Sequence, residues 1–182
     1  VCEEEGLELA FDTPSGKIEL FSADLEAMGF DPMPEYYPID EPPPGMFRLI
    51  TVRAPVHTFG RTTNNRLLSE VFAENEVWLN ATAAKSLPAF AGHELKTGDL
   101  VMLVNQDGVK SNPVRVKVTE RIRGDCVYMV HGFGHTARGL KFTHGRGASD
   151  SELTTKYAVD PIMGGTGTHV NFVSIEKPEA TS

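Results

Sequence analysis

The feature that most constrains the fold of this 182-residue chain is a series of short strand-like segments separated by glycine-containing turns. Residues 111–119 show the pattern clearly, because three valines alternate with Arg115 and Lys117. Such alternation places apolar side chains on one face of a strand and charged side chains on the other. Further strands are predicted over 47–53, 76–79, 100–105, 126–130 and 170–176. Short strands at these intervals predict a mainly β fold closed into a barrel.

Two brief helices are predicted between these strands. A helix over 64–72 would carry on one face the apolar residues Leu67, Leu68, Val71 and Phe72, which is the pattern of a helix packed against a core. Asn80 directly follows a predicted strand, where its side chain can cap a second helix over 81–87. The barrel is therefore expected to have short helical inserts.

Residues 1–45 have a different character and predict an arm rather than a domain. Residues 17–21 alternate as a strand would, and Ser22 can cap a short helix over 22–27. Prolines concentrated between 32 and 44 predict a stiff, extended connector. We therefore expect an N-terminal arm and connector (1–45), a β-barrel domain (46–178) and a tail (179–182). The first residue is valine, so we interpret the chain as a piece of a longer polypeptide.

Charge and cysteine content exclude several classes of protein. A net charge of −8 argues against a general nucleic-acid-binding protein, which normally carries a basic face. The two cysteines do not form a Cys-x-x-Cys motif, so a cysteine-ligated iron–sulfur cluster or structural zinc is not expected in this chain. No apolar run approaches the roughly 18 residues of a membrane span, so no membrane insertion is expected.

The segment after the first barrel strand is unusually rich in hydrogen-bonding groups. It contains Thr51, Arg53, His57, Thr58, Arg61, Thr62, Thr63, Asn64 and Asn65. Residues 45–69 also contain four arginines and no acidic residue. Arginine offers a planar fork to phosphate oxygens, while hydroxyl and amide groups supply directional contacts. This composition favours an anionic ligand with many hydrogen bonds, although a solvated surface loop has similar residues.

Other glycine-rich segments carry no clear catalytic motif. His131, Gly132 and His135 follow a predicted strand, and the glycines indicate a ligand-lining loop rather than a helix on which two histidines share a metal. Residues 143–150 and 160–168 lack both the Rossmann and the P-loop patterns. No nucleophile motif is present. We expect no catalytic residue and no metal ligand, which is typical of a module that holds a cofactor for chemistry elsewhere.

Six segments in a fixed order resemble one known family. Their motifs are Leu-Ile-Thr-x-Arg…His-Thr…Arg-Thr (49–62), Val-Trp-Leu-Asn (77–80), Leu-Lys-Thr-Gly-Asp-Leu-Val (95–101), Val-Lys-Val-Thr…Ile-Arg-Gly-Asp (116–125), Tyr-Met-Val-His-Gly-Phe-Gly-His (128–135) and Leu-Thr…Asp-Pro…Gly (153–164). Together they resemble the C-terminal molybdopterin-dinucleotide-binding domain of the dimethyl sulfoxide reductase superfamily. The segment 13–21 is similar to the one that enters this domain. The Gly-Phe-Gly-His loop (132–135) and the Arg-Thr-Thr-Asn-Asn run (61–65) are most like the thiosulfate and polysulfide reductase branch.

The resemblance implies a double-psi β-barrel-like domain, of the aspartate-decarboxylase-like kind, within a larger catalytic subunit. The implied cofactor is bis(molybdopterin guanine dinucleotide) with molybdenum or tungsten. The family's [4Fe-4S] cluster and metal-ligating side chain lie in earlier parts of such enzymes, so the isolated chain is expected to be inactive.

Carried over by position, the resemblance also names the residues that would bind the cofactor. Those of the first loop are Thr51, Arg53, His57, Thr58, Arg61 and Thr62. Asn80 closes the next strand, His131 and Gly132 approach a pterin, and Asn171 lies in the final strand. Asp150 occupies a place where relatives often have asparagine.

The resemblance further implies partners and a location. The partners are the remaining domains of the parent subunit, an iron–sulfur electron-transfer subunit and a membrane-anchor subunit, at the periplasmic or outer face of the bacterial cytoplasmic membrane. Two alternatives stay open at this stage. The chain could be a stand-alone β-barrel interaction module whose proline-rich arm docks a partner, or a small self-contained barrel enzyme such as a decarboxylase.

Overall fold

The computed structural model describes residues 11–33 and 35–178. The chain divides into two compact units, with the boundary between Ile39 and Asp40. The acidic N-terminal residues, Cys2 and the expected tail over 179–182 lie outside the described residues.

The first unit contains one short helix, α1 (Ala23–Ala27). Its start is fixed as expected, because the Ser22 hydroxyl oxygen accepts a hydrogen bond from the Leu25 amide at 3.3 Å. The strand expected over 17–21 is wrong, since these residues adopt turns and irregular structure. A strand needs a neighbour to pair its backbone groups, and no described segment pairs with this one.

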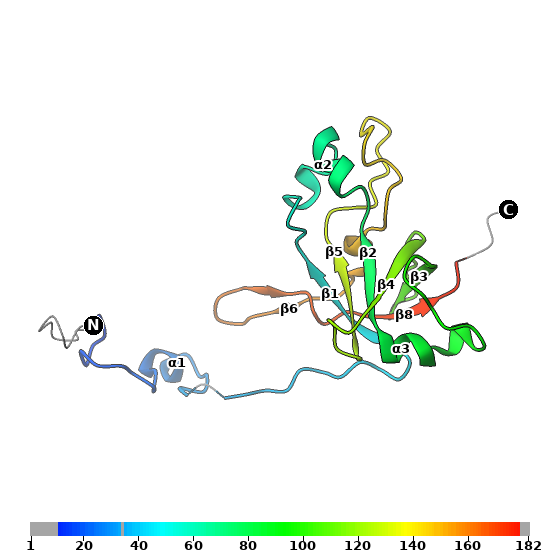
Figure 1. Cartoon of the computed structure of the whole chain (residues 1–182). Helices are drawn as coiled ribbons and strands as arrows, with labels where there is room; N and C mark the ends of the chain where they lie inside the picture. The colour runs from blue at the N-terminus through cyan, green and yellow to red at the C-terminus, as the bar shows by residue number, and fades with distance from the viewer. Residues whose placement is uncertain (1–10, 34, 179–182) are drawn as a thin grey trace, which may run out of the picture. The chain divides into compact units, whose positions relative to one another are not determined.

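The second unit is built around a closed barrel of six strands (Figure 1). In barrel order these are β1 (Phe47–Val52), β5 (Cys126–Val130), β2 (Glu76–Asn80), β4 (Val114–Thr119), β3 (Leu100–Asn105) and β8 (Phe172–Glu176), with β8 closing on β1. The pairs β1–β5 and β2–β4 are parallel, and the remaining pairs are antiparallel. This arrangement confirms the mainly β, double-psi-barrel-like fold with short helical inserts.

The barrel interior is filled by alternating apolar side chains. Val114 and Val116 of β4 are buried, whereas Arg115 between them is exposed, as the alternation predicts. Leu49, Leu79 and Met129 belong to the same core and have almost no exposed surface. Each such burial stabilises the fold by roughly 1.5–3 kcal/mol, so the core anchors the strand ends that carry the loops described below.

The helices of this unit are short: α2 (Arg66–Val71), α3 (Ala81–Ser86) and α4 (Asp150–Leu153), with single turns η1 (Phe59–Arg61) and η2 (Pro88–Phe90). The predicted cap of α3 is confirmed, because Asn80 Oδ1 accepts from the Thr82 amide at 2.8 Å. The predicted apolar face of α2 is only partly buried: Leu67 and Val71 are 71% and 72% exposed, whereas Phe72, directly after the helix, packs against Val130 and Phe133. This helix lies on loops beyond the end of the barrel rather than against its core (Figure 1).

Within the described ranges, none of the helices has both the length and the apolar character needed to span a lipid bilayer.

Candidate functional site

The site begins with two parallel strands that end side by side. Val52 of β1 is paired with Val130 of β5, and the His131 amide donates to the Val52 carbonyl at 2.9 Å. Because parallel strands end at the same edge, the loops that follow β1 and β5 emerge together. The sequence motifs over 49–62 and 128–135 are therefore brought to one end of the barrel.

Glycine allows these two loops to interlock. Gly132 has a φ of +98°, and a Cβ atom placed there would lie 2.4 Å from the Gly60 nitrogen. Gly134 has a φ of +78°, and its Cβ atom would lie 2.4 Å from the Ser149 nitrogen. Both positions thus require glycine for conformation and for space. The close backbone approach expected at this loop occurs here between loops of the chain itself.

An open pocket of about 410 Å³ lies at this end of the barrel. It is lined by Thr51, Val52, Phe59, His131, Asp150, Ser151, Thr154 and Thr168. These residues come from β1, the two interlocked loops, α4 and the segment before β8. The pocket therefore collects hydroxyl and imidazole groups from segments that are far apart in the sequence.

A chain of contacts crosses one wall of the pocket. The Arg53 guanidinium carbon lies 4.8 Å from the centre of the Phe59 ring, and this ring meets the His131 imidazole edge-on at 5.3 Å. His131 Nδ1 is 2.7 Å from Asp150 Oδ2, and the Asp150 carboxylate is buried. A carboxylate on one ring nitrogen fixes the orientation of an imidazole. The other nitrogen, Nε2, has no hydrogen-bond partner among the described residues.

Two side chains predicted to bind the cofactor, those of His57 and Thr62, form hydrogen bonds within the chain. His57 is 3% exposed, with Nε2 at 2.8 Å from the Phe72 carbonyl and Nδ1 at 3.2 Å from the Thr62 hydroxyl. Since a carbonyl only accepts, Nε2 carries the proton and Nδ1 accepts from Thr62. The Thr62 oxygen in turn accepts from the Thr58 amide at 2.9 Å. This network holds the loop against Phe133, whose ring lies 5.6 Å from that of His57.

Two predicted asparagines are also fully used by the fold. Asn171 is buried; its Oδ1 accepts from the Thr155 and Lys156 amides, and its Nδ2 donates to the Lys156 and Thr168 carbonyls. Asn80 lies where β2 ends and β5 begins, at the end of the barrel opposite His131. Its Nδ2 donates to the Ile122 carbonyl at 2.8 Å. The structure therefore does not bring Asn80 together with the other predicted residues.

Sequence reasoning missed the residues that tie the loops to one another. Asn75 is buried, donates to the carbonyls of Val130 and Ala148, and accepts from the Ala148 amide. Asn64 accepts from the Phe142 amide at 2.9 Å. Asn75 directly precedes an apolar strand, and this position was the only feature of the sequence that could have indicated its role. Phe59, Ser151, Thr154 and Thr168 were likewise not predicted to line a pocket.

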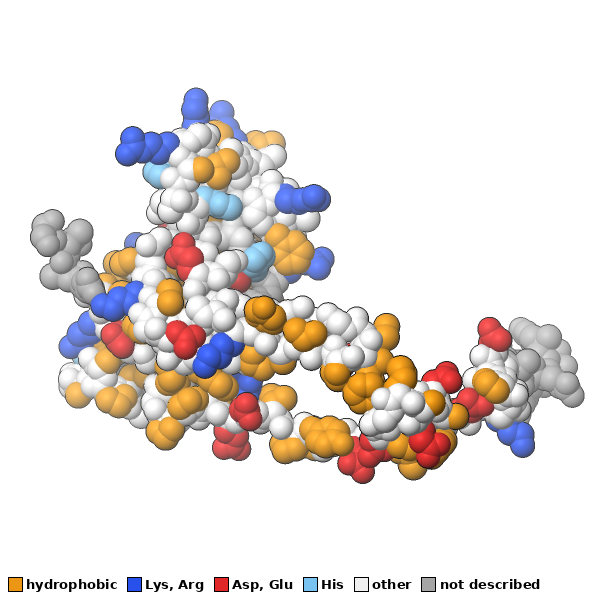
Figure 2. Space-filling view, turned by 180° about the vertical axis from the view of Figure 1, so that it is seen from behind, with side chains coloured by type: hydrophobic (Ala, Val, Ile, Leu, Met, Phe, Trp, Pro, Cys, Tyr) orange, Lys and Arg blue, Asp and Glu red, His pale blue; other side chains and the backbone are white. Residues whose placement is uncertain are grey.

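The loops beyond this end of the barrel carry a concentrated positive charge. We define the basic lobe as α2 with the loops over 57–65 and 135–147. Its exposed cations are Arg61, Arg66, Arg138, Lys141 and Arg146. Figure 2 shows Lys and Arg side chains gathered over one end of the second unit. Glu70 is the lobe's one acidic side chain, and it pairs with Arg66 at 3.2 Å. The lobe is strongly basic although the chain has a net charge of −8.

The site has no side-chain cluster that would hold a metal directly. Within the described residues, no group of three or more His, Cys, Asp or Glu side chains is close enough to bind an ion. His131 and His135 have separate partners, since His131 contacts Asp150 and His135 Nε2 lies 3.3 Å from the Thr63 hydroxyl.

The chain is similar to parts of larger known proteins. The chain is 34% identical, over 144 residues, to the thiosulfate reductase molybdopterin-containing subunit PhsA of Salmonella typhimurium, covering 77% of this chain and 18% of that protein. It is 30% identical, over 185 residues, to an Escherichia coli protein provisionally named dimethyl sulfoxide reductase chain YnfE, covering 91% of this chain and 21% of that one. The chain thus spans about one fifth of the length of these relatives.

A solved structure shares the fold. Acetylene hydratase from Pelobacter acetylenicus is similar with a TM-score of 0.67 and 18% identity, over 93% of this chain and 24% of that chain. The model of the family described as "Molydopterin dinucleotide binding domain" matches residues 47–172, which include the whole pocket and the basic lobe. The chain therefore belongs to the molybdopterin dinucleotide-binding domain family.

Proposed function

We propose that the pocket and the basic lobe hold bis(molybdopterin guanine dinucleotide) within a larger oxidoreductase subunit. The observation that carries this proposal is the convergence of the loops after β1 and β5 on one pocket, inside the region that matches the family. A molybdenum or tungsten atom carried by the cofactor would supply the redox chemistry. This chain's own residues would bind and orient the cofactor.

The residues present fit such a ligand. The pocket offers the hydroxyl groups of Thr51, Ser151, Thr154 and Thr168, which suit a ligand with many polar atoms. Arg53 lies over the ring of Phe59, which lines the pocket, and the exposed cations of the basic lobe lie on the adjoining loops. Guanidinium groups bind phosphate oxygens through paired hydrogen bonds. Positive charge of this density would offset the charge of two pyrophosphates.

The pocket can hold only part of such a cofactor. Its volume of about 410 Å³ lies toward the lower end of the range, roughly 300–1,000 Å³, of pockets that bury a drug-sized ligand. A bis-dinucleotide is considerably larger. We therefore assign the remaining contacts to the other domains of the parent subunit, which agrees with the small share of its relatives that this chain spans.

The hydrogen-bond geometry separates the predicted site residues into two roles. Thr51, Arg53, Arg61 and His131 have polar atoms available to a ligand, and we assign them to direct contact. His57, Thr62, Gly132, Asp150 and Asn171 are engaged within the chain, and we assign them to positioning the loops. Thr58 contributes only its backbone amide to this network, so we assign its exposed hydroxyl to direct contact. Asn80 caps α3 at the opposite end, so we assign it no contact with the cofactor.

For the parent enzyme we propose a thiosulfate or polysulfide reductase. This rests on the identity to a subunit named thiosulfate reductase. The proposal places an iron–sulfur cluster in another part of the parent, and electron-transfer and anchor subunits beside it at the outer face of the cytoplasmic membrane. The isolated 182-residue chain should then have no reductase activity.

The proposal is tested by measuring cofactor content in the complete subunit. We expect Arg61→Ala and Thr51→Val to lower both the molybdenum or tungsten content and the guanine nucleotide released by acid hydrolysis. Removing a hydrogen bond from a charged donor costs about 1.5–3 kcal/mol, so affinity should fall about tenfold or more with Arg61→Ala. Two guanine nucleotides per metal atom in the wild-type subunit would support the bis-guanine form.

Lys85→Ala is the matched control for Arg61→Ala. Lys85 is an exposed cation of α3, which begins at the end of the barrel opposite the pocket. Its removal should leave metal and nucleotide content unchanged. Wild-type content in both pocket-end variants would contradict the proposal and would favour an interaction module without cofactor.

A further inference from the structure

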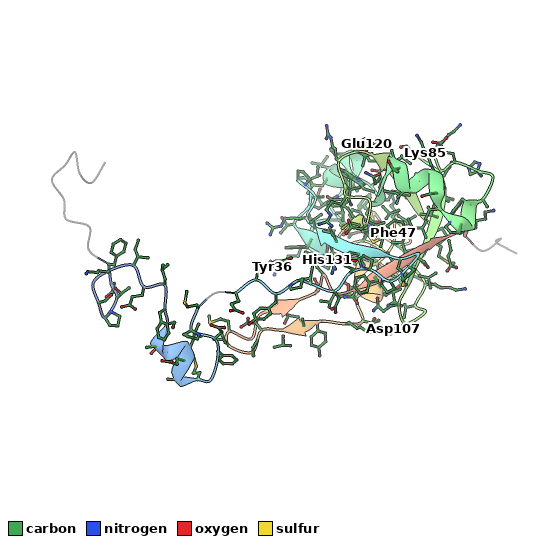
Figure 3. The ribbon with its side chains drawn as sticks, turned by 90° about the horizontal axis from the view of Figure 1, so that it is seen from below. Tyr36, Phe47, Lys85, Asp107, Glu120 and His131 are labelled. Carbon is green, nitrogen blue, oxygen red and sulfur yellow. The ribbon has the colours of Figure 1, made fainter. Side chains whose placement is uncertain are left out.

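A hairpin extends from the barrel beside the pocket and exposes apolar side chains. It consists of β6 (Ala158–Val159) and β7 (Thr166–Gly167) joined by a turn. Its large apolar residues are Tyr157, Val159, Ile162 and Met163, and Met163 is 86% exposed. The hairpin projects away from the barrel in Figure 1 and again in the view from below in Figure 3. Isolated two-stranded hairpins are marginally stable in water.

The base of this hairpin is nevertheless held firmly. Asn171 is buried and donates to the carbonyls of Lys156 and Thr168, one on each side of the hairpin. The Thr155 hydroxyl donates to an Asp107 carboxylate oxygen at 2.5 Å, and Asp107 lies beside the hairpin base in Figure 3. The direction in which the hairpin leaves the barrel is therefore fixed by hydrogen bonds.

The tip is also ordered by local hydrogen bonds. The Asp160 amide donates to the Gly165 carbonyl at 2.8 Å, and the Asp160 carboxylate accepts from the Ile162 and Met163 amides. A tip held in this way presents Ile162 and Met163 in a defined conformation. Groups of exposed large apolar side chains are typical of interaction surfaces.

The two ends of the hairpin reach the pocket. Thr154 precedes the hairpin, Thr168 follows it, and both line the pocket with His131 and Asp150. A surface that covers the hairpin would thus continue directly to the pocket. The open side of the pocket would be narrowed by whatever packs against the hairpin.

The charge of the hairpin indicates the chemistry of what covers it. Between 156 and 168 the charged residues are Lys156, whose ammonium lies 3.8 Å from an Asp107 oxygen, and Asp160, whose carboxylate caps the turn. The two charges are of opposite sign, so the hairpin carries no net charge, and its large exposed side chains are apolar; an apolar surface therefore suits the hairpin best. The curated relatives extend far beyond the region matched here, which is 18% and 21% of their lengths.

We propose that the hairpin over 156–168 docks on an apolar surface of another domain of the same polypeptide and thereby closes one side of the pocket. This inference rests on family membership and on the geometry of the hairpin. It does not require that the ligand be the guanine form of the cofactor.

The decisive experiment places a photo-reactive amino acid at position 163 of the complete subunit, purified with any subunits that accompany it. Cross-linked peptides are then identified by mass spectrometry. We expect cross-links from 163 to a region of the same polypeptide outside these 182 residues. Cross-links only to a second polypeptide, only within these residues, or to nothing would overturn the proposal.

A pair of substitutions at the same position tests the apolar nature of the contact. In the complete subunit, Met163→Asp should increase hydrogen exchange of the hairpin amides at least tenfold, whereas Met163→Leu should leave exchange as in the wild type. Equal protection in both variants would exclude the apolar contact. Cofactor binding and docking are distinguished by measuring both in the Thr51→Val subunit. A loss of metal together with an unchanged cross-link from position 163 would show that docking does not depend on cofactor binding.

Discussion

The two ends of the barrel use polar residues in opposite ways. At the end where β1 and β5 finish, long interlocked loops surround a pocket and leave hydroxyl, imidazole and guanidinium groups available. At the end where these strands begin, a pocket of about 430 Å³ lies between β1, α3 and the turn before β5. The polar side chain of Asn80 at this end is nevertheless used by internal contacts, such as that with the Ile122 carbonyl. A polar residue therefore indicates a ligand site only where its hydrogen bonds are not already made.

The same distinction separates neighbouring residues at the pocket end. His57 has both ring nitrogens bonded within the chain, whereas His131 has one nitrogen bonded and lines the pocket. Both histidines follow a barrel strand by a few residues, so their sequence context is similar. We infer that part of this end is a rigid support and part is the binding surface. The substitutions below test that division.

The largest effect should come from Gly132→Ala at the pocket end, compared with Gly124→Ala at the other. A Cβ atom at Gly132 would meet the backbone of Phe59 and Gly60 at a φ of +98°, whereas one at Gly124 has open space. The left-handed conformation costs alanine about 1–2 kcal/mol and overpacking about 1–3 kcal/mol. Urea unfolding of the 182-residue chain should show a loss of about 2–5 kcal/mol for Gly132→Ala only. Equal stability of the two variants would contradict the interlock.

The next comparison is between two asparagines, Asn75 at the pocket end and Asn80 at the opposite end. Asn75→Ala removes three buried hydrogen bonds that join β5 to the loop at Ala148, and at about 1 kcal/mol each the loss should be about 3 kcal/mol. Asn80→Ala mainly removes a helix cap, worth about 1 kcal/mol. Thermal or urea unfolding of both variants measures the difference. A larger loss for Asn80→Ala would reverse our interpretation of which end is the rigid support.

Two threonines at the pocket end then distinguish support from binding surface. Thr62→Val removes hydrogen bonds with His57 and the Thr58 amide and should cost about 1–2 kcal/mol of unfolding free energy. The Thr51 hydroxyl lines the pocket and has no hydrogen-bond partner among the described residues, so Thr51→Val should change stability by less than about 0.5 kcal/mol. In the complete subunit the ranking of the two variants should be the opposite: Thr51→Val should lower the cofactor content per folded molecule more than Thr62→Val does. A Thr62→Val variant as stable as the wild type would contradict the assignment of Thr62 to the rigid support.

Much of the barrel could be predicted from the sequence because its strands are regular. The alternation of Val114 and Val116 with Arg115 depends on one face being buried, and a period of two reports this directly. The helix over 64–72 was placed correctly within a few residues, yet only Leu68 and Phe72 of its apolar face are half-buried, while Leu67 and Val71 are exposed. Helical periodicity in the sequence indicates that a helix has an apolar face, but it does not indicate whether a hydrophobic core packs against that face.

The site was less predictable because its geometry depends on contacts between distant segments. The loops containing His57 and His131 could be named from their polar and glycine content, and the structure joins them at one end. The roles of Asn75, Thr154 and Thr168 could not be predicted, since each depends on a partner or pocket formed by residues far along the chain. Asn80 was predicted both to cap a helix and to contact the cofactor, because both roles favour asparagine. The sequence alone could not distinguish the two roles.

The smallest effect should come from an ion pair at the end opposite the pocket. Burial alone would raise the pKa of Asp125. Hydrogen bonds from the Arg123 guanidinium, together with those from the Asp125 backbone amide and the Cys126 thiol, outweigh burial and hold this pKa below its ordinary value. The pair therefore stabilises the fold above the unfolded-state pKa of about 3.9 and loses this effect as the pH falls through the lower folded-state value. Because the Arg123 side chain is 81% exposed and the Asp125 side chain 40% exposed, solvent screens the pair, and Asp125→Asn should cost less than about 1 kcal/mol at neutral pH.

Urea unfolding of wild type and Asp125→Asn at neutral pH, and at successively lower pH below about 3.9, measures this difference. The difference in unfolding free energy should shrink as the pH falls, and it should also shrink in about 1 M salt, where the screening length is about 3 Å. A difference that grows on acidification would show that Asp125 acts through something other than Arg123. A loss as large as that expected for Asn75→Ala would place a second rigid support at this end, and the contrast between the two ends of the barrel would then fail.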